Sequence, residues 1–223
     1  MKTYSIIVAG GIGSRMGFSI PKQFLELNSK PILMHTIECF YKAINNTEII
    51  VALPKTQFEY WEKLCEKHHF DIPHQLSPGG SHRFESVKNA LDYVQEKSIV
   101  AIHDGVRPLV NKTVIIQCLN KAQKHGNAIP FLSINESLRK IQNNGLSTIV
   151  DRDVYKLIQT PQCFKSQLIK QAYQQNYNPL FTDDSSVVEQ MGEAIFLVQG
   201  NKENIKITTP EDLKIAEYFL SIL

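Results

Sequence analysis

The feature that most constrains the fold is a regular alternation of short apolar runs and amphipathic segments through residue 126. Three runs rich in β-branched residues, at 3–10, 47–54 and 98–104, are typical of buried strands. This alternation predicts parallel strands joined by right-handed helical crossovers. We therefore expect an α/β fold in which helices cover both faces of a mostly parallel, twisted sheet. The expected helices are residues 31–44, 56–69, the part of 77–97 after a Gly-Gly turn, and 111–126.

The alternation ends after residue 126. Residues 127–152 contain short β-like pieces around an Asn-Asn-Gly turn, which is a strong hairpin signal. Because no long helix intervenes, we expect residues 134–151 to form a β-arm that projects from a single domain spanning residues 1–223. Further helices are expected at 165–176, 182–192 and 209–223, with a strand at 194–200.

Three polar segments follow the predicted parallel strands and show neither helical nor strand periodicity. They are residues 10–24, 77–86 and 103–108. Open parallel sheets place their ligand sites at the carboxyl ends of the strands. The sequence therefore predicts a site in these three loops.

The first loop, "AGGIGSRMGFSIPKQF" at residues 9–24, is rich in glycine. Gly10, Gly11 and Gly13 would let backbone N–H groups approach phosphate oxygens. The loop lacks the Gly-Lys-Ser/Thr end of a P-loop, and its glycine spacing is not that of a dinucleotide-binding loop. A nicotinamide oxidoreductase would also need an acidic residue after the second strand, which here ends in "VALPK". The loop therefore indicates phosphate chemistry of another kind.

The same loop carries two cations, Arg15 and Lys22, with Pro21 restricting the backbone beside the lysine. Arginine grips phosphate oxygens with a planar fork, and lysine adds a compact charge. Phosphoryl and nucleotidyl transfers depend on positioning and on neutralising the charge that builds on the phosphate oxygens. Two cations in one phosphate loop favour such a transfer, although a solvated surface role is the alternative.

The other two loops carry different chemistry. Asp104, in "HDGVRP", is expected where a parallel strand ends, and a carboxylate facing a triphosphate suits Mg²⁺. The alternative for Asp104 is an ion pair with Arg107. Gly80 and Ser86, in "SPGGSHRFES", could read the polar edge of a base, although the segment could also be an ordinary helix-start turn.

Composition and net charge limit the classes of partner that the protein is expected to bind. The net charge of +2 is too small to indicate binding to nucleic acid or to an anionic membrane. No apolar run approaches the roughly 18 residues of a transmembrane helix, and the amino-terminal run is too short for a signal peptide. We expect a cytoplasmic protein with small-molecule substrates.

Seven motifs, in order, make the chain similar to a known family. They are "AGGIGSRMG…PKQF", "GGSHRFESV", "HDGVRP", "VDRD", "QTPQCF", "FTDDSSVVE" and "NIKITTPEDL". Nearly the whole chain resembles the 2-C-methyl-D-erythritol 4-phosphate cytidylyltransferases of the non-mevalonate isoprenoid pathway. The resemblance implies a Rossmann-like nucleotidyltransferase fold. It also implies transfer of CMP from CTP to a sugar-alcohol phosphate, with release of pyrophosphate and use of Mg²⁺.

The resemblance also implies roles for individual residues. Arg15 and Lys22 would stabilise the transition state at the α-phosphorus of CTP, and Lys206 would orient the phosphates. Gly80 and Ser86 would recognise cytosine, and Asp104 would lie near the ribose, the phosphates and Mg²⁺. The catalytic set is then Arg15, Lys22, Arg152 and Lys206, and the substrate-binding set is Gly10, Gly11, Gly13, Gly80, Ser86, Asp104, Arg107, Ser137, Thr160, Thr182 and Asp183.

Members of this family are homodimers whose β-arm reaches the neighbouring substrate site. The resemblance therefore implies a homodimer formed through residues 134–151, with Arg152 serving the other subunit's site. The chain departs from the family pattern at two positions of interest. Ser81 stands where many members have aspartate, and Ser137 replaces a threonine but keeps a hydroxyl.

Two other functions stay open at this point. A ribitol 5-phosphate cytidylyltransferase would share the loops, but the "VDRD" stretch favours the methylerythritol enzyme. A nicotinamide oxidoreductase is disfavoured by the missing ribose-binding acid. In the favoured reaction the sugar phosphate oxygen attacks in line and needs no general base, because it is already an anion at neutral pH.

Overall fold

The computed structural model describes residues 1–11 and 20–222. Its centre is a twisted sheet in the order β10-β7-β11-β6-β1-β4-β5, with β12 also paired to β7. Strands β6, β1, β4 and β5 are mutually parallel, and β11 joins β6 in the antiparallel sense. The strands are β1 (Thr3–Val8), β4 (Glu48–Leu53), β5 (Gln75–Pro78), β6 (Ile99–Asp104), β7 (Asn127–Ser133), β10 (Lys156–Ile158), β11 (Gln162–Lys165) and β12 (Leu197–Gln199).

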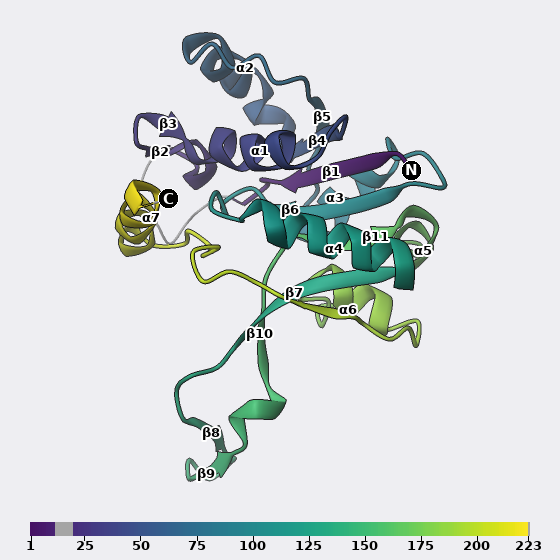
Figure 1. Cartoon of the computed structure of the whole chain (residues 1–223), viewed down its shortest axis with the longest axis vertical. Coiled ribbons are helices and arrows are strands. Elements are labelled where there is room, and N and C mark those ends of the chain that lie inside the picture. The colour runs from purple at the N-terminus through teal and green to yellow at the C-terminus, as the bar shows by residue number, and fades with distance from the viewer. Residues whose placement is uncertain (12–19, 223) are drawn as a thin grey trace.

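Helices cover both faces of this sheet, as the alternation predicts (Figure 1). Side chains of β1 alternate between two buried clusters: Ile7 packs with α1 and α4, and Ile6 packs with α3, α5 and α6. This period of two is what a strand buried on both faces requires. The helices are α1 (Ile32–Ala43), α2 (Phe58–Lys67), α3 (Arg83–Leu91), α4 (Lys112–His125), α5 (Ser166–Ala172), α6 (Asp184–Glu189) and α7 (Pro210–Ile222).

One strand was missed by the sequence analysis. Strand β5 (Gln75–Pro78) pairs in parallel with β4 at the edge of the sheet, and its last two residues fall in the segment 77–86 that the sequence predicts to be a loop. It has only four residues, of which Leu76 alone is a large apolar side chain, and it ends in proline. Such a segment carries no strand periodicity, and proline is tolerated because this strand lies at the edge.

A third cluster attaches the carboxyl-terminal part of the chain to the end of β6. Ile207 and Ala216 are buried with Val106 and Leu109, beside the short strands β2 (Glu26–Leu27) and β3 (Lys30–Pro31). The Ile207 N–H donates to the Val106 carbonyl at 2.9 Å. This packing places residue 206 next to the loop that follows β6.

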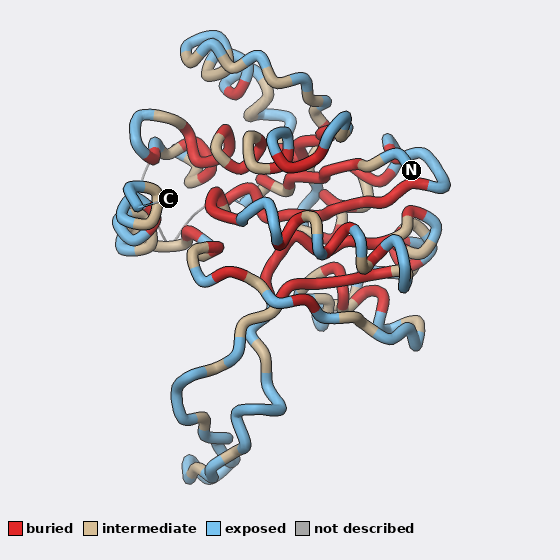
Figure 2. The backbone as a smooth tube through the Cα atoms, viewed as in Figure 1, coloured by how far each residue is buried: buried red, intermediate tan, exposed pale blue. Residues whose placement is uncertain are grey.

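Residues 138–150 form a separate hairpin, β8 (Leu138–Ile141) with β9 (Ser147–Val150), followed by the 3₁₀ turn η4 (Arg152–Val154). The hairpin projects from the body of the protein (Figure 1). Its residues are mostly exposed, whereas the sheet is mostly buried (Figure 2). Gly145 has a φ of 81° in the turn, which is the conformation that an Asn-Gly turn supplies. Among the helices described here, none is long and apolar enough to cross a membrane.

Candidate active site

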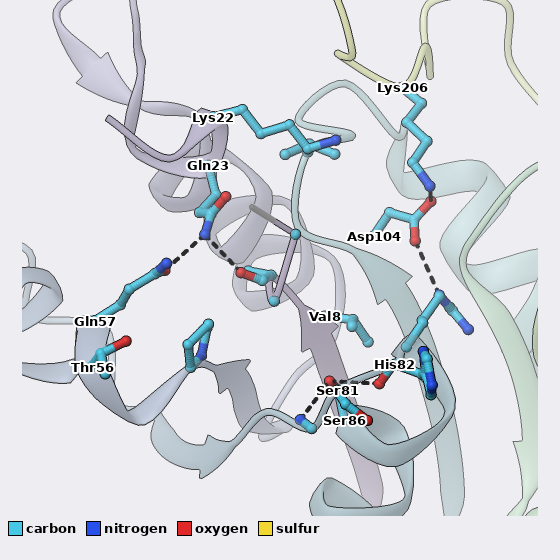
Figure 3. Close-up of a pocket in the computed structure, with 17 residues that line it drawn as sticks. Val8, Lys22, Gln23, Thr56, Gln57, Ser81, His82, Ser86, Asp104 and Lys206 are labelled. Carbon is cyan, nitrogen blue, oxygen red and sulfur yellow. Dashed lines mark hydrogen bonds and ion pairs between the residues drawn. The ribbon is translucent and has the colours of Figure 1, made fainter. Parts of the chain in front are cut away.

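A cleft of about 700 Å³ lies at the carboxyl ends of β1, β4 and β6, and the three polar loops meet there. Its size is in the usual range for small-molecule sites. Seven of the predicted site residues line this cleft: Gly10, Gly11, Lys22, Gly80, Ser86, Asp104 and Lys206. Lys22 and Lys206 extend into the cleft from different walls, with Asp104 beside Lys206 (Figure 3). Gly13 and Arg15 lie outside the described residues.

Asp104, the last residue of β6, is only 7% exposed and is surrounded by cations. Its Oδ2 lies 3.0 Å from Lys206 Nζ and 3.3 Å from Arg107 Nε, and its Oδ1 lies 3.4 Å from Arg83 Nε. Burial alone would raise the pKa of this carboxyl, but Arg83, Lys206 and Arg107 outweigh burial and hold the pKa well below its usual range. Asp104 is therefore an anion at any physiological pH.

A buried hydrogen-bond chain fixes the backbone of Asp104. The Arg107 carbonyl can only accept, so His103 Nε2 carries the proton and donates to it at 3.0 Å. His103 Nδ1 then accepts from the Thr160 hydroxyl at 3.0 Å, and Thr160 Oγ1 accepts from the Asp104 N–H at 3.1 Å. Burial lowers the pKa of His103 to about 4, so the neutral ring that this chain requires is the form present near neutral pH.

The loop between β5 and α3 is also held by its own hydrogen bonds. The Gly80 N–H donates to Ser86 Oγ at 3.0 Å, and the Ser86 hydroxyl donates to the His82 carbonyl at 3.1 Å. Ser81 donates from both its N–H and its hydroxyl to Glu85 Oε2, at 2.7 and 2.6 Å. A Cβ on Gly80 would lie 2.2 Å from Glu85 Cβ, so only glycine allows this close turn.

Lys22 begins the 3₁₀ turn η2 (Lys22–Phe24), which buried neighbours hold in place. Gln23 Nε2 donates to the Ala9 carbonyl at 2.8 Å and to Gln57 Oε1 at 2.9 Å, and so ties the turn to two walls of the cleft. Phe24 is buried and stacks with Trp61 of α2, with ring centroids 6.1 Å apart. The lysine that faces the cleft is therefore anchored by the two residues that follow it.

Arg83 is a member of this site that the sequence analysis missed. It lines the cleft, and its Nη1 and Nη2 donate to Asp184 Oδ1 and Oδ2 at 2.8 and 2.7 Å. One signal could have found it, because Arg83 is the first residue of α3, where the helix dipole disfavours a cation. An arginine in that position indicates a nearby anion.

The sequence also predicts that Arg107, Thr160 and Asp183 bind substrate. None of the three lines the cleft in the part of the chain that the structure describes. Arg107 Nε donates to the Asp104 carboxylate, and the Thr160 hydroxyl accepts from the Asp104 N–H. Arg107 also donates to the Asn204 carbonyl at 2.8 Å. Asp183 caps α6, with its oxygens accepting from Ser186 N, Gln162 Nε2 and Ser185 Oγ at 2.9, 2.7 and 2.8 Å.

Three further predicted residues lie away from the cleft of this chain. Thr182 is exposed in the turn that precedes α6. Ser137 and Arg152 are exposed at the base of the projecting hairpin, where the Arg152 guanidinium donates to the Asn135 carbonyl. A contact of these two hairpin residues with substrate would therefore require a different cleft from their own.

Comparison with known proteins identifies the group to which this chain belongs. The model of the 2-C-methyl-D-erythritol 4-phosphate cytidylyltransferase family matches residues 3–222. The chain belongs to this family. A member of that name from Phocaeicola vulgatus is 52% identical over 220 residues, which cover 99% of this chain and 100% of that protein. The corresponding protein of Bacteroides thetaiotaomicron is 51% identical over the same shares of the two chains.

Solved structures of the family have the same fold. The crystal structure of 4-diphosphocytidyl-2C-methyl-D-erythritol synthase from Anaerococcus prevotii matches with a TM-score of 0.84 and 27% identity, over 99% of this chain and 96% of that one. The Thermus thermophilus cytidylyltransferase matches with a TM-score of 0.77, also at 27% identity, over 99% of this chain and all of that one. The family fold, a mostly parallel sheet covered by helices, is therefore confirmed.

The hydroxyl of Thr160 gives a first prediction. Replacing Thr160 with valine keeps the shape but leaves the Asp104 N–H and His103 Nδ1 without their buried partner. We expect the free energy of unfolding to fall by about 1–3 kcal/mol. Chemical denaturation measures this loss, and Thr160→Ser, which keeps the hydroxyl, serves as the control. Unchanged stability in Thr160→Val would mean that the hydroxyl has no such internal role.

The buried His103 gives a prediction for pH. Its pKa is about 4 in the folded chain and about 6.5 when unfolded. Since the unfolded state binds the proton more readily, stability is lost as the pH falls from about 6.5 to 4, by about 3 kcal/mol from this group. The contribution of Asp104 is lost only below its unfolded pKa of about 3.9, outside that window.

Glutamine at position 103 can still accept from Thr160 and donate to the Arg107 carbonyl, but it does not titrate. We expect His103→Gln to flatten the stability profile between pH 6.5 and 4 by the same amount, about 3 kcal/mol, in urea unfolding at several pH values. Parallel profiles for the two proteins would show that the imidazole is not held neutral.

Proposed function

We propose that this chain transfers CMP from CTP to 2-C-methyl-D-erythritol 4-phosphate, forming 4-diphosphocytidyl-2-C-methyl-D-erythritol and pyrophosphate in isoprenoid precursor biosynthesis. The observation that carries this proposal is the convergence of Lys22, Lys206 and an ionised Asp104 on one cleft, in a chain that belongs to the cytidylyltransferase family. A nucleoside triphosphate and a sugar phosphate are both anions, and this cleft brings cations to the place where they would meet.

The cations address the main difficulty of the reaction, which is the approach of one phosphate to another. Lys22 and Lys206 lie on different walls of the cleft, so a triphosphate between them would contact a positive charge on each side. Such fixed charges stabilise the charge that develops on the phosphorus oxygens without having to reorganise. The attacking phosphate oxygen is already ionised, so the residues need only align it for in-line displacement of pyrophosphate. Arg15 is proposed to assist Lys22.

The cytosine ring is proposed to lie against the loop that contains Gly80 and Ser86. The bonds from Ser81 to Glu85 and from Gly80 to Ser86 hold the loop before any ligand binds. Gly10 lies opposite, because a Cβ there would be 3.4 Å from Ser86 Oγ. Both glycines line the cleft and carry no side chain, so a flat base can approach the backbone at these two positions.

Mg²⁺ is the cofactor that we propose. Among the described residues, no three His, Cys, Asp or Glu side chains gather into a complete metal site. Mg²⁺ often binds through one or two carboxylates together with substrate phosphates. Asp104 is the residue that would hold it, because its carboxylate is ionised and lines the cleft. When bound, the ion would neutralise phosphate charge and orient the triphosphate.

We also propose that the chain acts as a homodimer in which the projecting hairpin completes the partner's cleft. Ile141, Leu146 and Ile149 of the hairpin are 69%, 64% and 77% exposed, although they are large apolar side chains. A two-stranded hairpin has no core in which to bury such residues, and a contiguous exposed apolar patch often marks an interface. Arg152, at the base of the hairpin, would then bind the sugar phosphate in the partner's cleft.

Substrate choice tests the proposed function. Pyrophosphate release is measured with each of four nucleoside triphosphates, combined with methylerythritol, ribitol or hexose phosphates. We expect only the pair of CTP and 2-C-methyl-D-erythritol 4-phosphate to react efficiently. Equal or better use of ribitol 5-phosphate would instead support the pentitol phosphate activity.

Lys22 is expected to act mainly in the transition state. Lys22→Ala should therefore lower kcat by about 10²-fold or more, with a smaller change in KM for CTP. Steady-state kinetics with both substrates measure this, and Lys55→Ala, on an exposed lysine of the nearby 3₁₀ turn η3 (Lys55–Gln57), is the matched control. An unchanged kcat in Lys22→Ala would remove the lysine from the mechanism.

Exchange of subunits tests the shared cleft. Lys22→Ala damages a subunit's own cleft, whereas Arg152→Ala should damage the cleft of its partner and raise KM for the sugar phosphate alone. Mixing the two impaired variants under conditions of subunit exchange, at a sugar phosphate concentration below the raised KM, should restore part of the activity, because mixed dimers contain one cleft with both side chains intact. No recovery, despite mixed dimers detected by native mass spectrometry, would contradict the exchange of Arg152 between subunits.

A further inference from the structure

Arg83 joins two carboxylates that come from distant parts of the chain. Its two terminal nitrogens donate to Asp184, at the start of α6, in a bidentate pair. The Nε–H group points to Asp104 Oδ1 at 3.4 Å. One N–H group on each of the three guanidinium nitrogens is therefore directed at a carboxylate oxygen.

Asp184 has no part in the cleft itself. Its side chain is fully buried, and Tyr173 donates its hydroxyl to Asp184 Oδ1 at 2.6 Å. With the two bonds from Arg83, this carboxylate accepts three hydrogen bonds in a fixed geometry. A buried ion pair adds little net stability compared with apolar packing. Stability alone therefore does not explain why Arg83 and Asp184 are paired here.

The two carboxylate oxygens of Asp104 have different partners. Oδ1 lies on the side of Arg83, while Oδ2 lies between Arg107 and Lys206. Because Asp184 holds both terminal nitrogens of Arg83, the orientation of the guanidinium is fixed, and its Nε–H group faces Asp104 from one direction. The rotation of the Asp104 carboxylate about its side-chain bond is thereby restricted.

We propose that Arg83 is a positioning residue for Asp104, and that Asp184 and Tyr173 fix the orientation of Arg83. This inference rests on the proposed function, in which Asp104 acts at the triphosphate. Lysine could not replace Arg83, because one ammonium group cannot hold both oxygens of Asp184 and still approach Asp104 from the required direction.

Charge and position have opposite consequences here, which makes the proposal testable. The cluster holds three cations, Arg83, Arg107 and Lys206, and two carboxylates, Asp104 and Asp184. Asp184→Asn removes a negative charge, so an electrostatic role alone would make CTP bind more tightly. If Asp184 positions Arg83, the same substitution instead weakens CTP binding. Arg83→Lys conserves the charge, so a purely electrostatic role would leave CTP binding unchanged. If Arg83 positions Asp104, this substitution weakens CTP binding.

The experiment measures CTP affinity by calorimetry with Mg²⁺ and without the second substrate, together with steady-state kinetics and thermal unfolding. The variants are Asp184→Asn, Arg83→Lys and Tyr173→Phe, which removes only one bond to Asp184. Glu38→Gln is the matched control, because Glu38 is a half-buried carboxylate that pairs with Lys30 and Lys42.

We expect Asp184→Asn and Arg83→Lys each to weaken CTP binding and to lower kcat/KM for CTP by about tenfold or more, with KM for the sugar phosphate unchanged. Tyr173→Phe should change the same quantities in the same direction by a smaller factor, and it decides the matter if the other two variants do not fold. Glu38→Gln should lower only the unfolding temperature.

Unchanged or tighter CTP binding in variants that unfold at lower temperature would overturn the inference and leave Arg83 as a tie between α3 and α6. The failure of the proposed function has a different signature. In that case the wild-type protein itself neither binds CTP nor releases pyrophosphate, and the inference is lost with it.

Discussion

The structure depends on how the chain stabilises the negative charge of one buried carboxylate, that of Asp104. An ionised carboxylate with 7% exposure is strongly unfavourable unless cations and hydrogen bonds surround it. The cations come from three places: Arg83 from α3, Arg107 from the loop after β6, and Lys206 from the segment before α7. Compensation of this one charge therefore requires that the middle and the end of the chain meet at the end of β6. The cleft is the space that these segments enclose.

The same compensation prepares the cleft for its substrates. The cations are already in place before a phosphate arrives, so little reorganisation accompanies binding, and the pre-set charge acts in a partly buried site where screening is weak. The supporting bonds are internal: the ring of His103 and the hydroxyl of Thr160 hold the Asp104 backbone and are not available to solvent. Arg107 and Thr160, which their motifs predict to bind substrate, bond to Asp104 in this structure. This explains why a motif of this kind can be recognised in a sequence while the role of each member cannot.

Local patterns in the sequence predicted the fold well because helices and buried strands have strong periodicity. Asp104 was placed correctly at the end of β6, since residues 99–102 are all apolar and a polar loop follows. Strand β5 was missed because four residues at a sheet edge carry no such pattern. The pair of Arg83 and Asp184 was missed for a different reason: the two residues are 101 positions apart, and only the fold brings them together. Within "TDD" the sequence does not show which aspartate caps the helix and which pairs with Arg83.

The hairpin of β8 and β9 differs from the central sheet in how it is stabilised. In the central sheet large apolar side chains are mostly buried, but along the hairpin Ile141, Leu146 and Ile149 remain exposed, because two strands alone enclose no core. Hydrogen bonds between β8 and β9 hold the shape of the hairpin, and its large apolar side chains face solvent. A shape maintained in this way is suited to contact a second surface. Arg152 follows the hairpin by two residues, so a contact that buries the apolar residues would also bring a guanidinium to that surface. Association and substrate binding would then be one event, and the completeness of each cleft would depend on the state of its neighbour.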